Sequence, residues 1–376
     1  MKIIKKVIEV LNLLIVLGAY IFIGVRAAQI SFEKDSKYSF LILVGFMVYS
    51  MVAMLLHIIL HEGGHLIAGL ATGYEFTSFR VGSLAWIKDK EGKIRLKRMK
   101  IQGTDGQCLL RPPKVAIEEC PYKWYHLSGG LMNIGLGVVC VFLYLFLLPK
   151  NYITYALFEE FGVLGIAIGL ANLIPCKANG VQNDGYNLLE IGKDINTKKC
   201  INMILEINAL LTVADSYADL PKELIEEIKA IDFSKMDITN ASIANALNYQ
   251  ASMYFAEGDY EKAYQLQKCL LDAPGVIEII KYEARCECLF YEIVHEQNNE
   301  VIEELYDKQL QKYVKVTEMY PSRQRLLYAY YKLYMKDEQK ANEAYEKLKK
   351  LVDTYMIKAD ALLELEVVTK IKAGEI

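Results

Sequence analysis

Long apolar stretches dominate the first half of the 376-residue chain, and polar segments separate them. A helix of about 20 apolar residues crosses a bilayer core of roughly 30 Å, and four stretches meet this length. Their expected bounds are about 7–27, 39–70, 127–148 and 152–174. The fourth has Glu159 and Glu160 near its start, which either lie at the membrane interface or shorten the span. The pattern predicts a polytopic bundle of about four membrane helices.

The first apolar stretch follows Lys2, Lys5 and Lys6 and therefore resembles a secretory signal peptide. Its apolar character continues to about Ala28, which is longer than the apolar region of a typical signal peptide. Further spans follow it. We therefore interpret this stretch as a retained membrane anchor.

The polar segment 73–126 carries a β pattern. The stretches Phe76–Ile87 and Lys93–Ile101 are rich in β-forming residues, and a turn sequence at 89–92 separates them. This predicts a hairpin, and Gln107–Leu110 is a possible further strand before two prolines. Two interpretations remain open for a small sheet near the membrane: it is an ornament of the fold, or its edge accepts an extended substrate as an added strand.

The chain becomes polar and helical after about residue 186. The segment Ala251–Pro274 resembles one tetratricopeptide repeat, with small residues at the expected helix contact and a Gly-Asp turn. A weaker echo covers Tyr328–Leu348, but the spacing is not a multiple of 34 residues. We predict a mainly α protein: a membrane domain over 1–195 with a small membrane-associated sheet, then a cytosolic all-α, tetratricopeptide-like domain over 196–376.

Charge supports this division. Residues 1–150 carry 18 Lys and Arg against 10 Asp and Glu, whereas the remainder carries 25 against 36. The basic residues flank apolar spans, so they report membrane orientation and do not indicate nucleic-acid binding. Eleven of them lie in 73–126. We therefore expect a multi-pass protein of a bacterial cell membrane with both termini in the cytoplasm, where the eight cysteines, which form no C-x-x-C pair, stay reduced.

The second span contains His61-Glu62-Gly63-Gly64-His65. Histidines four positions apart lie on one face of a helix, so both imidazoles can reach one zinc ion, and the intervening Glu62 can accept a proton from the attacking water. Ionisable groups within an apolar span are costly and therefore indicate function. The two glycines weaken a helix by about 1 kcal/mol each, which is consistent with close approach of another helix or of substrate.

A third ligand is expected after the fourth span. The second and fourth spans cross the membrane in the same direction, so their cytoplasmic ends come together. Asn183-Asp184-Gly185 follows the fourth span, and a carboxylate is a common third zinc ligand. We therefore predict that Asp184 lies beside His61 and His65, with Gly185 allowing a tight turn.

These elements resemble the site-2 protease family of intramembrane metalloproteases over roughly residues 39–190. The family places an H-E-x-x-H helix, a G-P-x-x-N-like stretch and an Asp-Gly segment in this order, and the stretch from Gly129 to Asn133 approximates the second element. The resemblance implies that His61, His65 and Asp184 bind one zinc ion and that Glu62 is the catalytic base. It also implies that Asn133 positions substrate or stabilises the oxyanion.

The chain departs from the family pattern at two places. Gly130 replaces the usual proline, and residues 177–183 are inserted before Asp184, where they could lengthen a loop that gates the site. Asn172 either ends the fourth helix or forms a hydrogen bond near the site. His57, one turn before His61, is a packed histidine, a partner of the site or an alternative ligand. His126 and His295 carry no pattern and are expected at an interface and on the surface.

The resulting expectation is a zinc metalloendopeptidase that hydrolyses membrane-inserted proteins or precursor peptides near the cytoplasmic face. The helical domain would then bind a cytosolic protein or peptide, although such an assignment rests on fold analogy alone. Two alternatives stay open. One is a non-catalytic scaffold that acts through its helical domain, and the other is a protease of the prenyl-processing type.

Overall fold

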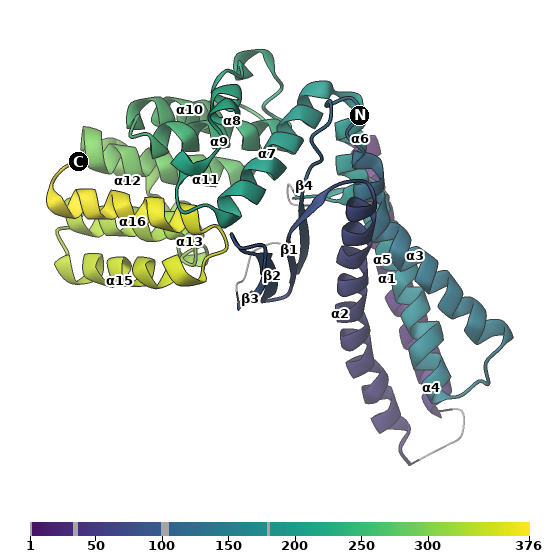
Figure 1. Cartoon of the computed structure of the whole chain (residues 1–376). Coiled ribbons are helices and arrows are strands. Elements are labelled where there is room, and N and C mark those ends of the chain that lie inside the picture. The colour runs from purple at the N-terminus through teal and green to yellow at the C-terminus, as the bar shows by residue number, and fades with distance from the viewer. Residues whose placement is uncertain (1, 33–36, 99–104, 179–180) are drawn as a thin grey trace. The chain divides into compact units, whose positions relative to one another are not determined.

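The computed structural model describes residues 2–32, 37–98, 105–178 and 181–376. Figure 1 shows a mainly helical chain. It also contains a small antiparallel sheet of four strands. The chain divides into two compact units. The first contains Met1–Gly82 and Gly103–Lys193, and the second contains Ser83–Gln102 and Asp194–Ile376.

The first unit is built around long apolar helices. Its helical elements are α1 (Lys2–Phe32), α2 (Ser39–Ala71), α3 (Tyr122–Phe146), α4 (Tyr152–Thr154), the π-helical turn η1 (Tyr155–Glu160), α5 (Phe161–Leu173) and α6 (Asp184–Lys193). Four of the described helical segments are long and apolar enough to cross a membrane: Lys6–Phe32, Ser39–Ala71, Tyr122–Phe146 and Tyr152–Leu173. The predicted four spans are confirmed at this level. The third starts five residues earlier than expected, because Tyr122 already begins the helix.

Large apolar side chains cover the outside of these helices. Phe40, Met51 and Phe146 are 73%, 75% and 70% exposed, and many neighbours on α1, α2 and α3 share this exposure. Apolar surface of this extent is unfavourable in water and matches a lipid environment. The exposure therefore supports a membrane protein independently of helix length.

The two acidic residues near the start of the fourth span lie inside the unit. The Arg26 guanidinium donates to both carboxylate oxygens of Glu159 at 3.1 Å, and the Ser50 hydroxyl donates to Glu160. Both glutamates are buried. They do not shorten the helix, because the candidate span continues from Tyr152 to Leu173, and Arg26 pairs with Glu159 inside the unit. Their place at the membrane interface stays a prediction.

The sheet consists of β1 (Glu75–Val81), β2 (Leu84–Lys88), β3 (Ile94–Arg98) and β4 (Gly106–Arg111), in the order β3-β2-β1-β4. In the first unit β1 pairs antiparallel with β4, from Val81 opposite Gly106 to Glu75 opposite Arg111, with an irregularity between Phe76 and Ser78. In the second unit β2 pairs with β3, from Leu84 opposite Arg98 to Lys88 opposite Ile94.

The predicted hairpin and further strand are confirmed, with one correction. The stretch predicted as one strand from Phe76 to Ile87 is two strands, because a turn at Gly82, whose φ is +56°, separates β1 from β2. The turn at 89–92 joins β2 and β3, and Asp89 Oδ1 accepts hydrogen bonds from the Glu91 and Lys93 amides. Residues 99–101 of the predicted second strand lie outside the described residues.

The second unit is a helical domain that also contains the β2–β3 hairpin. Its helical elements are α7 (Ile195–Val213), η2 (Tyr217–Asp219), α8 (Lys222–Lys229), η3 (Phe233–Lys235), α9 (Ala241–Ala256), α10 (Tyr260–Asp272), α11 (Glu278–Tyr291), η4 (Glu292–Glu296), α12 (Asn299–Leu305), α13 (Lys308–Val316), α14 (Pro321–Ala329), η5 (Tyr330–Tyr334), α15 (Glu338–Thr354) and α16 (Lys358–Ala373). The sequence assigns the hairpin to the membrane domain. The contacts group it with the helices instead, because Ala85 and Ile87 are buried in one apolar cluster with Met203 and Ile207 of α7.

Two helical hairpins occupy the positions of the suggested repeats. Helices α9 and α10 pack together across a turn in which Gly258 has a φ of +84°, and Asp259 caps α10 by accepting from the Lys262 amide. Helices α14 and α15 form a second packed pair. Paired helices are therefore observed, and a tetratricopeptide-like regularity remains a prediction.

Candidate metal centre

Helix α2 presents His61 and His65 on one face, as their spacing predicts. Their Nε2 atoms lie 3.1 Å apart. The Asp184 carboxylate, at the first residue of α6, places Oδ2 3.0 Å from His61 Nε2 and 3.4 Å from His65 Nε2. The ligand atoms of these three residues all lie within 4.8 Å of one another. The structure thus brings together the three predicted ligands from segments more than 110 residues apart.

This geometry fits a zinc ion. Tetrahedral coordination with bonds of about 2.0–2.1 Å puts neighbouring ligand atoms about 3.3 Å apart. The three observed separations are 3.0, 3.1 and 3.4 Å. Two imidazoles and one carboxylate also leave the fourth position free, as in catalytic zinc sites. The donor set and its spacing are therefore suitable for zinc.

The main chain of α3 orients His65. The Nδ1 atom of His65 lies 2.6 Å from the Tyr125 carbonyl oxygen, so Nδ1 carries the proton and donates it. The Nε2 atom then keeps its lone pair for a metal, which is the usual arrangement for a ligating histidine. Nδ1 of His61 is buried and has no hydrogen-bond partner among the described residues. His65 is therefore the more firmly oriented of the two imidazoles.

Two glycines let α3 approach this face of α2. A Cβ atom at Gly129 would lie 2.8 Å from the His61 ring and closer still to His65 Nε2, so only glycine leaves room for both imidazoles. A Cβ atom at Gly64 would collide with the Ser128 carbonyl oxygen. The expected close approach at Gly64 is therefore made by another helix of the protein. Gly63 has open space around it.

Asn183 positions Asp184, a role that the sequence did not suggest. Its Nδ2 donates to the carbonyls of Ala171 and Ile174 at 2.8 and 2.7 Å, and its Oδ1 accepts from the amides of Cys176 and Tyr186. One side chain thus ties the end of α5 to the start of α6 through four hydrogen bonds. The only hint in the sequence was its position directly before Asp184.

The carboxyl group of Asp184 favours its charged form. Burial disfavours the negative charge, but the adjacent His61 and His65 imidazoles outweigh this effect and lower the pKa of the carboxyl below its ordinary value. A cation between the same groups would favour the same charged form.

The insertion before Asp184 includes a short hairpin. Strands β5 (Lys177–Ala178) and β6 (Val181–Gln182) pair antiparallel, with Lys177 opposite Gln182. Cys176 and Asn183 close its base, because the Asn183 amide donates to the Cys176 carbonyl at 3.2 Å. Residues 179–180 lie outside the described residues. The inserted residues therefore fold back on themselves before the chain reaches Asp184.

Strand β4 holds Glu62 beside the histidines. The backbone N–H of Cys108 donates to the Glu62 carboxylate, and a Cβ atom at Gly106 would lie within 2.8 Å of the Glu62 side chain. The Cys108 carbonyl accepts a hydrogen bond from the Tyr125 hydroxyl at 2.7 Å. Both main-chain groups of Cys108 are thus occupied. Strand β4 thus lies beside the predicted base, and both interpretations of the sheet stay open.

Asn133 contacts a different histidine. It is fully buried, and its Oδ1 lies 3.4 Å from Nδ1 of His57. Nε2 of His57 lies 2.8 Å from the Phe161 carbonyl, and the ring stacks on Phe161 with centroids 4.1 Å apart. Both nitrogens of His57 therefore face groups other than the three ligand residues, which makes it a packed histidine. The role of Asn133 towards substrate stays a prediction.

Three further residues from the sequence analysis are His126, Asn172 and His295. His126 contacts the ring of Tyr125, whose carbonyl orients His65, with ring centroids 5.1 Å apart. Asn172 donates to the Ile168 carbonyl one turn earlier at 3.1 Å, which agrees with a role at the end of the fourth helix. His295 is exposed in the second unit.

Comparison with protein-family models, curated proteins and solved structures gives no match to this chain.

Proposed function

We propose that this protein is an intramembrane zinc metalloendopeptidase of the site-2 protease type. The observation that carries the proposal is the convergence of His61, His65 and Asp184 at zinc-like separations, with Glu62 held beside them. Helix α2, which carries three of these four groups, is one of the helices long enough to cross a membrane. Substrates are membrane-inserted proteins or precursor peptides, hydrolysed near the cytoplasmic face.

Each residue has a distinct part in the proposed hydrolysis. His61, His65 and Asp184 would hold a zinc ion, which would supply a bound water of lowered pKa, about 7, and would polarise the scissile carbonyl. Glu62 accepts the proton of the attacking water and returns it to the leaving amine. The Cys108 amide orients the Glu62 carboxylate, and the Tyr125 carbonyl orients His65. Asn133 positions substrate or stabilises the oxyanion.

Glu62 argues against a non-catalytic scaffold with a structural metal. A structural zinc site is closed by four protein ligands and needs no general base. Here three ligand residues converge, and a carboxylate that is not one of them is hydrogen-bonded next to them. The Asn-Asp-Gly segment after the last span favours the site-2 type over the prenyl-processing type.

The proposed orientation places both termini in the cytoplasm of a bacterial cell. Cys108 and Cys120 are 8% and 3% exposed, so their failure to react would not report orientation. Cys269 is exposed in the second unit and is the suitable probe. A membrane-impermeant thiol reagent should label Cys269 in permeabilised cells but not in intact cells. Labelling in intact cells would invert the orientation.

The catalytic proposal is tested with Glu62→Gln. Purified protein should contain about one zinc per chain, and the variant should retain it while losing roughly 10²–10⁴-fold in cleavage of a co-expressed membrane reporter. Asp184→Asn should instead lose zinc. As a matched control, Asp194→Asn changes a carboxylate that caps α7 and should alter neither property. Unchanged reporter cleavage by Glu62→Gln would refute the proteolytic mechanism.

A further inference from the structure

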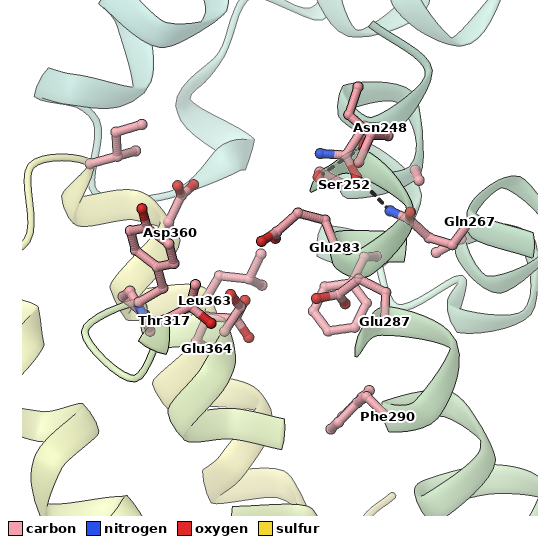
Figure 2. A pocket seen from close by; sticks show the side chains of 18 of the residues that line it. Asn248, Ser252, Gln267, Glu283, Glu287, Phe290, Thr317, Asp360, Leu363 and Glu364 are labelled. Atoms are coloured by element: carbon pink, nitrogen blue, oxygen red, sulfur yellow. Dashed lines mark hydrogen bonds between the residues drawn. The ribbon is translucent and has the colours of Figure 1, made fainter. Parts of the chain in front are cut away.

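The second unit contains a large cavity with an acidic lining. Its volume is about 570 Å³, which lies within the 300–1,000 Å³ typical of ligand sites. Figure 2 shows Glu283 and Glu287 of α11 on one side and Asp360 and Glu364 of α16 on the other. No lysine, arginine or histidine is among the residues that line it in the described part of the chain.

Two buried arginines of the protein neutralise only part of the negative charge of the cavity. Arg323 pairs with Glu283 at 2.5 Å, and Arg325 pairs with both Glu287 and Glu364. Both arginines are buried under the cavity wall. Two guanidinium groups thus face four carboxylates.

Asp360 is the carboxylate without a cationic partner among the described residues. Its Oδ1 accepts a hydrogen bond from the Tyr217 hydroxyl at 2.7 Å. Burial raises the pKa of this carboxyl to about 6, a cost that a bound cation would remove. The cavity wall thus has four carboxylates and two arginines, and Asp360 has no cationic partner in the described part of the chain. This excess of carboxylates suits the cavity to a cation.

A second wall of the cavity carries carboxamides. Asn245 and Asn248 come from α9, and Gln267 from α10 donates through Nε2 to Asn248 Oδ1 at 2.7 Å (Figure 2). Gln267 is 5% exposed, and its Oε1 has no hydrogen-bond partner among the described residues. A buried acceptor without a partner is costly, and a ligand donor would satisfy it. Carboxamides offer donors and acceptors together, as a peptide backbone requires.

Aromatic rings complete the lining. Seven tyrosines and two phenylalanines line the cavity: Tyr217, Tyr260, Tyr264, Tyr291, Tyr313, Tyr320, Tyr355, Phe255 and Phe290. Their faces attract lysine and arginine side chains through cation–π interactions and pack against the aliphatic parts of these side chains. Aromatic walls, carboxamides and uncompensated carboxylates are the complement of a basic peptide.

We infer that this cavity binds an extended peptide segment that carries lysine or arginine. A polyamine is the competing occupant, because it would satisfy the carboxylates equally well. It carries no acceptor for the carboxamide donors, whereas a peptide backbone supplies donors and acceptors alternately. The inference concerns the second unit alone and does not rest on the proposed proteolysis.

The test uses the purified full-length chain in detergent, both as wild type and as Glu62→Gln so that retained peptides are not hydrolysed. Random hexapeptide pools with one position fixed as Lys, Arg or Glu are the probes. Retention should favour the Lys and Arg pools over the Glu pool by roughly 10-fold, the effect of one hydrogen bond to a charged group. Equal retention of the basic and acidic pools would overturn the inference.

Matched variants then locate the bound peptide. Asp360→Asn should weaken binding of the best basic peptide by roughly 10-fold. Asp353→Asn makes the same change at an exposed position outside the cavity and should have no effect. Asn245→Ala removes an exposed cavity carboxamide without a described hydrogen bond and should also weaken binding, which covers the case of a misfolded Asp360→Asn. Unchanged affinity in both cavity variants, or spermine binding as tightly as the peptide, would refute the peptide assignment.

Discussion

In the first unit, His61, His65 and Asp184 direct their ligand atoms to one point, and no lysine or arginine pairs with Asp184 among the described residues. In the second unit, Arg325 lies between Glu287 and Glu364 and satisfies both. Both clusters are groups of ionisable residues in which some members, among them His65 and Arg325, are buried and others are partly buried. The first fits an external ion, whereas each glutamate of the second already has a guanidinium partner within the protein.

The presence or absence of a cationic side-chain partner distinguishes a structural carboxylate from one that can bind a ligand. Burial alone does not make this distinction. A buried carboxylate with a hydrogen-bonded arginine belongs to the fold, and removal of either partner is costly. A convergence of like acceptor atoms without a cationic side chain is unfavourable unless a cation or protons join it. Asp360 differs from its neighbours by the same criterion, which is why it marks the peptide cavity.

The largest expected effect tests the pairing of Arg325 with Glu287 and Glu364. Arg325→Met removes a side chain that is 1% exposed and leaves two glutamates unpaired, so it should lower the free energy of unfolding by about 3–5 kcal/mol. Denaturant unfolding monitored by circular dichroism measures the change. Lys349→Met removes an exposed partner of Glu346 and serves as control. Equal stability of the two variants would show that the Arg325 cluster is not structural.

The next effect tests the convergence at the metal centre. Gly129→Ala places a methyl group against both imidazoles and should reduce zinc affinity by roughly 100-fold, measured by competition with a chelator. Gly135→Ala on the same helix meets open space and should retain zinc. Loss of zinc in both variants would mean that the helix, and not the crowded ligands, determines affinity.

A smaller effect tests the support of Asp184. Asn183→Ala removes four hydrogen bonds between α5 and α6 and should weaken zinc binding by roughly 10-fold, because Asp184 is less well positioned. Asn172→Ala removes one hydrogen bond within α5 and is the control. Wild-type affinity in Asn183→Ala would show that α6 is held by other contacts.

The smallest effect concerns Asp360, the cavity carboxylate without a cationic partner among the described residues. The folded pKa of Asp360 is about 6 and the ordinary value is 3.8, so the folded state binds the proton more tightly. Below about pH 4 the carboxyl of Asp360 is protonated in both states and does not lower the free energy of unfolding. This free energy then falls as the pH rises from about 4 towards 6. Asp360→Asn should therefore raise the free energy of unfolding at pH 7 by more than at pH 4, where the carboxyl is protonated in the folded state. A gain of equal size at both pH values would exclude titration of Asp360.

The apolar helices and the pairing of His61 with His65 could be predicted because both depend on local pattern. Asp184 was predicted from the shared direction of the second and fourth spans and from the family resemblance. Helical spacing places His61 and His65 on one face, and hydropathy identifies the four spans. Asn183 and Cys108 were missed because their roles depend on main-chain atoms that other segments bring near. The division between units was misplaced at the β2–β3 hairpin for a similar reason, since Ala85 packs against residues more than 100 positions away.

Cys176 and Asn183 close the base of the β5–β6 hairpin next to Asp184. The position of Asp184 therefore does not depend on the length of the hairpin loop. Main-chain and side-chain hydrogen bonds fasten its base, so residues added between β5 and β6 extend away from a fixed stem. Loop length adds little to the entropic cost of such a closed structure. This segment is therefore a convenient place for inserting an epitope tag next to the candidate metal centre without moving Asp184.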